Sequence, residues 1–300
     1  MKAIHYQNYA KKIISRHLRN LVREKEGAIA SQDIECLHRM RVASRRLRTS
    51  FQIFKGLFPE EKLTKWKKYI RKIARVSGKA RDLDVLIEFL KEFRGGLKNP
   101  AHKTEIKQLL DFLRQRRQKL QGAVVGVLDE FEQKEIAGRI IKTMNALSPI
   151  SKNGTPGTIY RVGRKNIVKK LNDLLSYKAY VYQPHNVDKL HRLRIAAKRL
   201  RYTLEAFALV YGKKTDKFLE SVVKIQRLLG DLHNFDVWIE SLPRFVSRER
   251  KSAELAAMIN RVQNQCGNLR FRAYKKFVKF WKELRKEKFW DGLVRLTVLS

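Results

Sequence analysis

Residues 38–48 read HRMRVASRRLR, and residues 191–201 read HRLRIAAKRLR. No other segment of the chain matches a second segment so closely. On an α-helix, which turns about 100° per residue, each copy separates into an apolar face and a cationic face. We call the two cationic faces the first basic stripe (His38, Arg41, Arg45 and Arg48) and the second basic stripe (His191, Arg194, Lys198 and Arg201).

Neither basic stripe contains an acidic residue. A helix that only packs against a core usually carries both signs of charge on its solvent face. Four groups at helical spacing without a carboxylate therefore predict an anionic ligand. Arginine offers paired N–H donors that fit phosphate oxygens, whereas Lys198 offers a compact charge.

The overall charge points to the same kind of ligand. The chain has 300 residues, with 67 Lys and Arg against 29 Asp and Glu, and a net charge of +38. So large an excess opposes folding by self-repulsion, and a polyanionic partner is the simplest reason to carry it. A hydrophobic content of 43% is ample for a buried core. Two cysteines, Cys36 and Cys266, are too few for a disulfide framework or a cysteine-based zinc site, and we predict neither metal nor cofactor.

The sequence favours a protein of the cytoplasm. Its sparse cysteines fit a reducing compartment. The first residues, MKAIHYQNY, contain no apolar signal core, and no apolar run approaches the roughly 18 residues of a membrane span. We therefore predict a soluble cytoplasmic protein without a membrane span.

Helical patterning runs through the whole chain, and sustained alternation typical of strands is absent. Gly27 is expected to separate the first two helices, and Ser31 or Asp33 to cap the second. A new helix is expected after Gly78. The predicted helices of the first half cover about 4–26, 31–56, 60–76, 79–95 and 100–147, the last with a break near 122–126. Those of the second half cover about 158–182, the segment after Pro184, 215–229 and a long helix that ends near 288.

A second pair of matching segments supports an internal repeat. Residues 78–87 (GKARDLDVLI) match residues 230–239 (GDLHNFDVWI) at a spacing of 152, and the basic stripes are 153 residues apart. Residues 148–157 are dense in turn formers and predict a linker. We predict one all-α domain over 1–300, with a first helical repeat at 1–147 and a second at 158–300. Packing of the halves about a pseudo-twofold axis would bring the two basic stripes together.

The order of these motifs resembles the CHAD family, the conserved histidine α-helical domain. The shared pattern is His-x-x-Arg-x-x-x-(Lys/Arg)-x-x-Arg on a helix, followed by Gly-x-x-(Arg/His)-(Asp/Asn)-x-Asp-Val, with the whole unit repeated. The resemblance extends over nearly the whole chain. It implies two pseudo-symmetric four-helix bundles with a basic groove or pore between them, and binding of inorganic polyphosphate without cleavage.

Carried over position by position, the resemblance assigns anion binding to both basic stripes. It adds Arg81 of the Gly-x-x-Arg-Asp pattern, whereas His233 and Asn234 replace that pair in the second half. A chain of phosphates would meet positive charge along about three helical turns, and phosphate or sulfate would fit the same site. Attachment to polyphosphate granules is left open. Other basic residues are predicted as secondary anion contacts: Arg16, Arg19, Arg71, Lys72 and Arg75.

The titratable residues of the motifs could also serve metal binding or acid–base chemistry. His38 and His191 each lack a second His or Cys three or four residues away, so no metal site is predicted. As phosphate contacts among cations they would have lowered pKa values that a polyanion raises, so binding should take up protons as pH falls through about 7. Asp82 and Asp84 point about 200° apart on a helix and would not easily hold one magnesium ion. Ion pairing is the better interpretation of Asp84 and of its counterpart Asp236.

Three patterns have structural interpretations. Residues 130–134 (EFEQK) match a string found on strands of triphosphate tunnel enzymes, but they lie in helical sequence here. An aromatic stripe near the C-terminus, which could touch membrane or RNA, is better explained as the core face of the last long helix. Arginines beside the basic stripes are interpreted as outer contacts or as partners of acids on neighbouring helices: Arg39, Arg46, Arg192 and Arg199.

Three functions follow from these observations, in order of preference. Non-catalytic polyphosphate binding comes first, because no residue set predicts turnover and no catalytic residue is assigned. A nucleic-acid-binding protein that uses the same positive charge is the alternative. A phosphohydrolase that acts on polyphosphate through Asp and His residues comes third.

Overall fold

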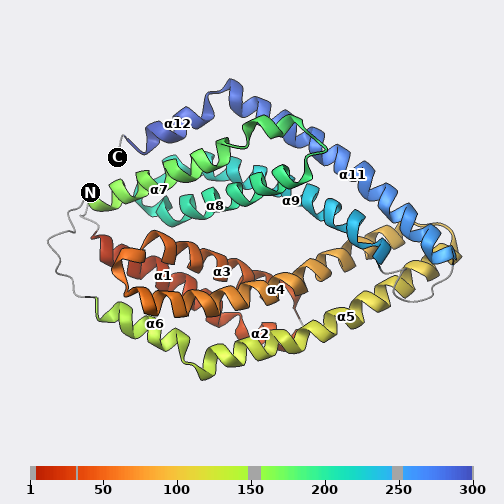
Figure 1. Cartoon of the computed structure of the whole chain (residues 1–300), viewed down its shortest axis with the longest axis horizontal. Coiled ribbons are helices and arrows are strands. Elements are labelled where there is room, and N and C mark those ends of the chain that lie inside the picture. The colour runs from red at the N-terminus through yellow and green to blue at the C-terminus, as the bar shows by residue number, and fades with distance from the viewer. Residues whose placement is uncertain (1–4, 32, 148–156, 245–252, 299–300) are drawn as a thin grey trace. The chain divides into compact units, whose positions relative to one another are not determined.

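The computed structural model describes residues 5–31, 33–147, 157–244 and 253–298. These residues form helices and contain no strand, which confirms the predicted all-α fold (Figure 1). The chain divides into two compact units. Unit 1 comprises Met1–Gly96 and Lys107–Ile159, and unit 2 comprises Leu97–Ile106 and Tyr160–Ser300. The predicted linker at 148–157 lies, apart from Gly157, outside the described residues.

Unit 1 is built on four long helices, with α3 packed against both α1 and α4. Large apolar side chains of these helices are fully buried, among them Phe51 and Ile70. Its elements are α1 (Tyr6–Arg23), α2 (Lys25–Ala30), α3 (Ile34–Ile53), the 3₁₀ helix η1 (Lys55–Leu57), α4 (Glu60–Gly95), most of α5 (Pro100–Gln133) and α6 (Ile136–Asn145).

Unit 2 has the same plan, with α9 packed against both α8 and α11. Phe207, Phe277 and Trp281 are among its fully buried side chains. Its elements are α7 (Gly157–Leu175), η2 (Lys178–Tyr182), α8 (Val187–Tyr211), η3 (Gly212–Thr215), α9 (Asp216–Ser241), α11 (Ala253–Lys286) and α12 (Phe289–Leu296). In the part of the chain that the structure describes, no helix is both long and apolar enough to cross a membrane.

Several predicted helix boundaries were wrong, and most of these were predicted at glycines. Gly27 lies inside α2, and Gly78 lies inside α4, which unites the helices predicted at 60–76 and 79–95. A glycine inside a helix costs only about 1 kcal/mol relative to alanine, so packing on both sides of it can outweigh the cost. The break predicted near 122–126 occurs instead at Glu135, which takes the left-handed φ of 48°. The helix predicted at 158–182 ends at Leu175.

Two local predictions were confirmed. Asp33 is the N-cap of α3, where its carboxylate accepts a hydrogen bond from the Glu35 N–H at 2.8 Å. On α11, Phe277 and Trp281 are buried in the core, as the aromatic stripe predicted. Phe271 of that stripe is 56% exposed, so the stripe is wider than the face that packs.

Gly163 allows α7 to approach α8 closely. A Cβ atom there would lie 2.7 Å from the Tyr211 hydroxyl oxygen and 3.2 Å from Phe207 Cδ1. We expect Gly163→Ala to lower the free energy of unfolding by about 1–3 kcal/mol, because the methyl group overpacks a buried contact. Urea denaturation measures the change. Gly267→Ala in α11 is the control: apart from the adjoining residues and backbone of its own helix, nothing lies within 4 Å of its added Cβ, so stability should rise by up to about 1 kcal/mol. Effects of the same sign would contradict this account.

Candidate anion-binding site

The first basic stripe lies on the side of α3 that meets α4. All four of its residues are half-buried, while Met40 and Leu47 on the opposite face are fully buried. The Arg41 guanidinium lies 3.8 Å from an oxygen of Asp82 on α4. A Cβ atom at Gly78 would lie 3.4 Å from Arg41 Nε, an ordinary van der Waals distance, so the guanidinium lies against α4 at this position.

Helices α3 and α4 run antiparallel, and their register can be followed through three contacts. Near one end the Phe51 and Trp66 rings lie 5.8 Å apart. Towards the other end Arg81 forms an ion pair with Glu35 at 3.1 Å, beyond the Arg41 contact. The two cationic helices therefore lie side by side along most of the first basic stripe.

The register places part of α4 beside the first basic stripe. Arg71 and Arg75 are exposed and precede Gly78 and Asp82 at intervals of seven residues. At about 100° per residue, these four positions share one face of α4. That face is the one that Arg41 contacts, so Arg71 and Arg75 extend the cationic surface from α3 onto α4.

The other predicted secondary contacts are placed differently. Lys72 forms an ion pair with Glu130 of α5, and Arg81 pairs with Glu35, so carboxylates already neutralise both cations. Arg16 is half-buried and Arg19 is exposed on α1. Within the described ranges, no ion pair or hydrogen bond joins these two side chains to the first basic stripe.

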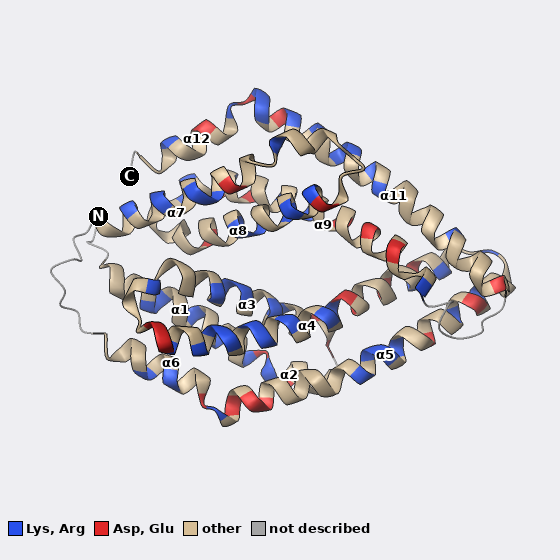
Figure 2. Cartoon of the chain, viewed as in Figure 1, with Lys and Arg blue, Asp and Glu red and all other residues tan. Residues whose placement is uncertain are grey.

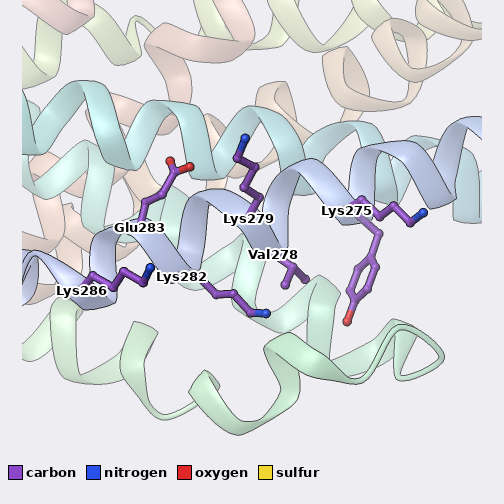
Figure 3. A pocket seen from close by; sticks show the side chains of 7 residues that line it. Lys275, Val278, Lys279, Lys282, Glu283 and Lys286 are labelled. Carbon is purple, nitrogen blue, oxygen red and sulfur yellow. The ribbon is translucent and has the colours of Figure 1, made fainter.

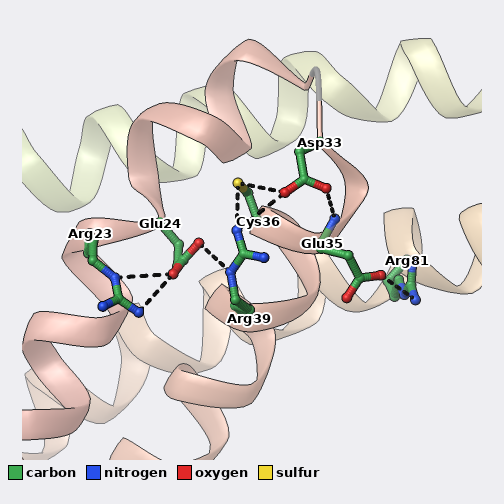
Figure 4. A network of polar contacts seen from close by, with 7 residues as sticks. All are labelled: Arg23, Glu24, Asp33, Glu35, Cys36, Arg39 and Arg81. Carbon is green, nitrogen blue, oxygen red and sulfur yellow. Dashed lines mark hydrogen bonds and ion pairs between the residues drawn. The ribbon is translucent and has the colours of Figure 1, made fainter.

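An acidic network lies beside the start of the first basic stripe (Figure 4). Arg39 donates to Glu24 at 2.8 Å and to Asp33 at 3.3 Å, and its guanidinium also lies 3.0 Å from the Cys36 sulfur. Arg192 in unit 2 pairs with Asp188 at 3.1 Å. Arg39 therefore pairs with acids outside its own helix, one of the two interpretations that the sequence allowed, whereas the partner of Arg192 lies on α8 itself.

The second basic stripe lies on α8 of unit 2. Its four residues are half-buried, and Leu193 and Leu200 on the opposite face are fully buried. At its far end the Arg201 guanidinium pairs with Glu205 at 2.8 Å and donates to Gln226 of α9 at 3.3 Å. The acid one turn beyond the stripe therefore offsets the charge of Arg201, which reduces the attraction that this residue can offer to an anion.

The second basic stripe begins at a pair of histidines. Nδ1 of His191 lies 3.0 Å from Nδ1 of His233, and the ring centroids are 4.3 Å apart. Burial lowers the pKa of His191, and Arg194 and Lys198 lower it further. Burial, then Arg194, lowers the pKa of His233 to about 3. Desolvation is thus a larger cause than the neighbouring cations on which the sequence prediction relied.

The acids of the second motif form ion pairs, as predicted. Asp84 pairs with Arg117 of α5 at 2.7 Å, and Asp236 pairs with Arg270 of α11. Sequence reasoning missed both arginines. They are 153 residues apart, which is the spacing of the basic stripes, so extending the repeat comparison would have found them.

One more cation was missed in unit 2. Arg227 on α9 follows Arg75 by 152 residues, the spacing of the second motif. It is exposed and shares a helix face with Gly230 and Asn234, as Arg75 does with Gly78 and Asp82. Arg227 is therefore a further candidate anion contact.

A separate basic surface lies on α11 (Figure 3). It is an open groove of about 450 Å³, whose lining includes Tyr274, Val278 and Glu283. Its four lysines are exposed: Lys275, Lys279, Lys282 and Lys286. A carboxylate among exposed lysines makes this groove a weaker anion site than the half-buried stripes.

These features define a class of protein, an all-α chain with an internal repeat in which each unit presents a half-buried basic helix face. Lys and Arg are frequent along α3 and α4, as Figure 2 shows. The family model of the CHAD domain matches residues 12–243, and the chain belongs to this family, as the motifs predicted. The CHAD family is associated with polyphosphate binding. In the described residues, no group of three or more His, Cys, Asp or Glu side chains could hold a metal ion.

The fold is similar to that of two solved structures. The crystal structure of the CHAD domain from the plant Ricinus communis has a TM-score of 0.73 and 22% identity, over 91% of this chain and 90% of that chain. PptA from Streptomyces chartreusis has a TM-score of 0.67 and 12% identity, over 93% of this chain and 100% of that chain. At these identities the similarity concerns the fold alone. No curated protein sequence matches this chain significantly.

Proposed function

We propose that the chain binds inorganic polyphosphate, without cleaving it, through the basic faces of α3 and α4 in unit 1 and of α8 and α9 in unit 2. The observation that carries the proposal is the partial burial of the stripe residues, of which Arg41 is the example. The Arg41 side chain is only 14% exposed, and its pair with the 73% exposed Asp82 is long at 3.8 Å. A cation that has already lost much of its water and mobility on folding loses little more of either when it binds an anion.

The length of each stripe favours a polymer over a single phosphate. From His38 to Arg48 the helix rises about 15 Å, as it does from His191 to Arg201. One orthophosphate would reach one or two of the four groups, whereas a linear polyphosphate would contact the whole series. Its repeated charges would also release many counterions, which makes binding strongly dependent on salt.

The surroundings of the acids support a non-catalytic role. Phosphoryl hydrolysis commonly uses carboxylates that hold a divalent metal ion. Asp84 and Asp236 are occupied by arginines, and Asp82 is replaced by Asn234 in unit 2. These ion pairs favour binding without hydrolysis over the third candidate function, a phosphohydrolase.

Competition separates the proposal from nucleic-acid binding. At fixed salt and equal phosphate concentration, we expect RNA and DNA to displace a labelled long-chain polyphosphate poorly, since bases and sugars hinder approach to half-buried cations. Binding isotherms across polyphosphate lengths supply the affinities. Equal displacement by nucleic acid would favour the alternative function. Release of orthophosphate in the presence of magnesium would instead identify a phosphohydrolase.

A further inference from the structure

We propose that His191 and His233 form a two-histidine subsite at the head of the second basic stripe, which takes up one proton when a phosphate-bearing anion binds beside Arg194 and Lys198. The inference rests on the proposed function and adds a property of unit 2 alone. The two sequence motifs contain His191 and His233 separately, and only the fold brings the two rings into contact.

The contact between the rings fixes how many protons the pair can hold. At a separation of 3.0 Å, one Nδ1 atom donates a hydrogen bond and the other accepts it. Protonation of the donor ring at its outer Nε2 gives an imidazolium that keeps this bond and strengthens it. A second proton on the accepting Nδ1 would remove the acceptor and place two N–H groups against each other. The pair therefore gains one positive charge and not two.

Charged groups of both signs face the pair. The rings border a wide-open cavity of about 880 Å³ whose titratable lining comprises His185, Asp188, His191, His233, Asp236, Glu240 and Arg270. Asp188 is paired with Arg192, and Asp236 with Arg270, so these carboxylates are already partly neutralised. Arg194 and Lys198 on α8 oppose protonation of both rings. An anion beside these two cations would cancel that opposition.

The surroundings of the two histidines determine the sign of the pH dependence. Burial and Arg194 hold the pKa of His233 at about 3, and burial also lowers the pKa of His191, so the free protein leaves the pair neutral near pH 7. A bound polyanion raises the pKa of the pair. Between the free and bound pKa values, the complex holds a proton that the free protein lacks. Affinity therefore rises as pH falls through the bound pKa, by up to about tenfold per pH unit for one proton.

Unit 1 lacks the subsite. Its equivalent positions hold His38 and Arg81, and the Arg81 guanidinium pairs with Glu35 at 3.1 Å. Arginine stays charged at every pH at which the protein is folded. This position therefore holds a fixed charge in unit 1 and a titratable ring in unit 2.

Isothermal titration calorimetry with polyphosphate of one defined length tests the inference. Titrations in buffers of different ionisation enthalpy count the protons taken up, and titrations between pH 8 and pH 6 give the affinity. The variants are His233→Gln, which cannot be protonated, and His233→Arg, which copies unit 1. We expect both to lose up to one proton of uptake and most of the rise in affinity, about tenfold over this range. His185→Gln, on the exposed side of the same cavity, should behave like the wild type.

Unchanged proton uptake in both His233 variants would overturn the inference and leave the proposed function standing. Failure of the wild type to bind polyphosphate at any pH would contradict the proposed function instead. The ligand-free protein then still tests the pair by nitrogen-15 NMR of the histidine rings. A neutral pair with one hydrogen shared between Nδ1 atoms at pH 7 is expected. Two rings that titrate independently near their ordinary value of about 6.5 would refute the pair.

Discussion

Replacement of Arg41, Arg45, Arg194 and Lys198 by alanine is expected to weaken polyphosphate binding by about 10³-fold or more without loss of helix content. A hydrogen bond to a charged group contributes about 1.5–3 kcal/mol, and neighbouring contacts do not add fully, so the total for four residues is at least about 4 kcal/mol. Alanine favours helix and none of the four side chains is fully buried, so α3 and α8 should remain folded. Binding isotherms and circular dichroism measure the two effects.

The groove on α11 provides the matched control. Alanine at Lys275, Lys279, Lys282 and Lys286 removes an equal number of positive charges, four, from exposed positions. We expect this variant to lose only a few-fold in affinity, through the general field of the protein. Equal losses in the two variants would show that net charge, and not the basic stripes, accounts for binding. Retained affinity in the stripe variant would move the site elsewhere.

The sequence also predicts that both stripes line one groove. Two variants, each with half of the four substitutions, test this prediction. One variant carries Arg41→Ala with Arg45→Ala, and the other Arg194→Ala with Lys198→Ala. If one polyphosphate chain engages both stripes, either variant weakens a single binding event. If the stripes act separately, each variant loses one of two sites and keeps the other at its original affinity.

Asp84→Ala is expected to lower the free energy of unfolding of unit 1 by about 3–5 kcal/mol. The side chains of Asp84 and Arg117 are only 5% and 11% exposed, so loss of the carboxylate leaves a guanidinium charge buried without its partner. Urea denaturation of the full chain, followed by circular dichroism, measures the loss. An exposed pair gives the comparison: Asp111→Ala breaks the Asp111–Arg114 pair, about half exposed, and should cost less than about 1 kcal/mol.

A double variant separates the loss of the pair from the burial of an unpaired charge. Asp84→Leu combined with Arg117→Met removes both charges while keeping apolar volume. We expect it to recover most of the stability lost in Asp84→Ala, because replacement of a buried pair by apolar residues is often neutral. An Asp84→Ala variant as stable as Asp111→Ala would show that the pair does not anchor α4 to α5.

The helical fold and the repeat could be predicted because they depend on periodicity. Apolar residues at helical spacing identify α3 and α8, and two spacings of about 153 residues identify the duplication. Helix ends were less predictable, because Gly27 and Gly78 each weigh only about 1 kcal/mol against the packing of a whole helix. The sequence alone does not show whether the cost of the glycine or the gain from packing is larger.

The candidate site was predictable in part for a related reason. Each basic stripe lies on one helix, so its spacing can be read along the chain. The pairing of Arg81 with Glu35 depends on how neighbouring helices are aligned, and so does the contact between His191 and His233. These pairings arise from helix register, which no single segment encodes.

Because α4 continues without a break through Gly78, one helix carries both candidate ligand contacts and an anchor to the core of unit 1. The helix is about 54 Å long and carries Arg71 and Arg75 in one half and the buried Asp84 anchor in the other. A continuous helix is stiff along its axis. The half of α4 that would meet the ligand is therefore held in place by the half that is anchored to α5. If Gly78 had broken the helix, the anchor at Asp84 would not restrict the motion of Arg71 and Arg75.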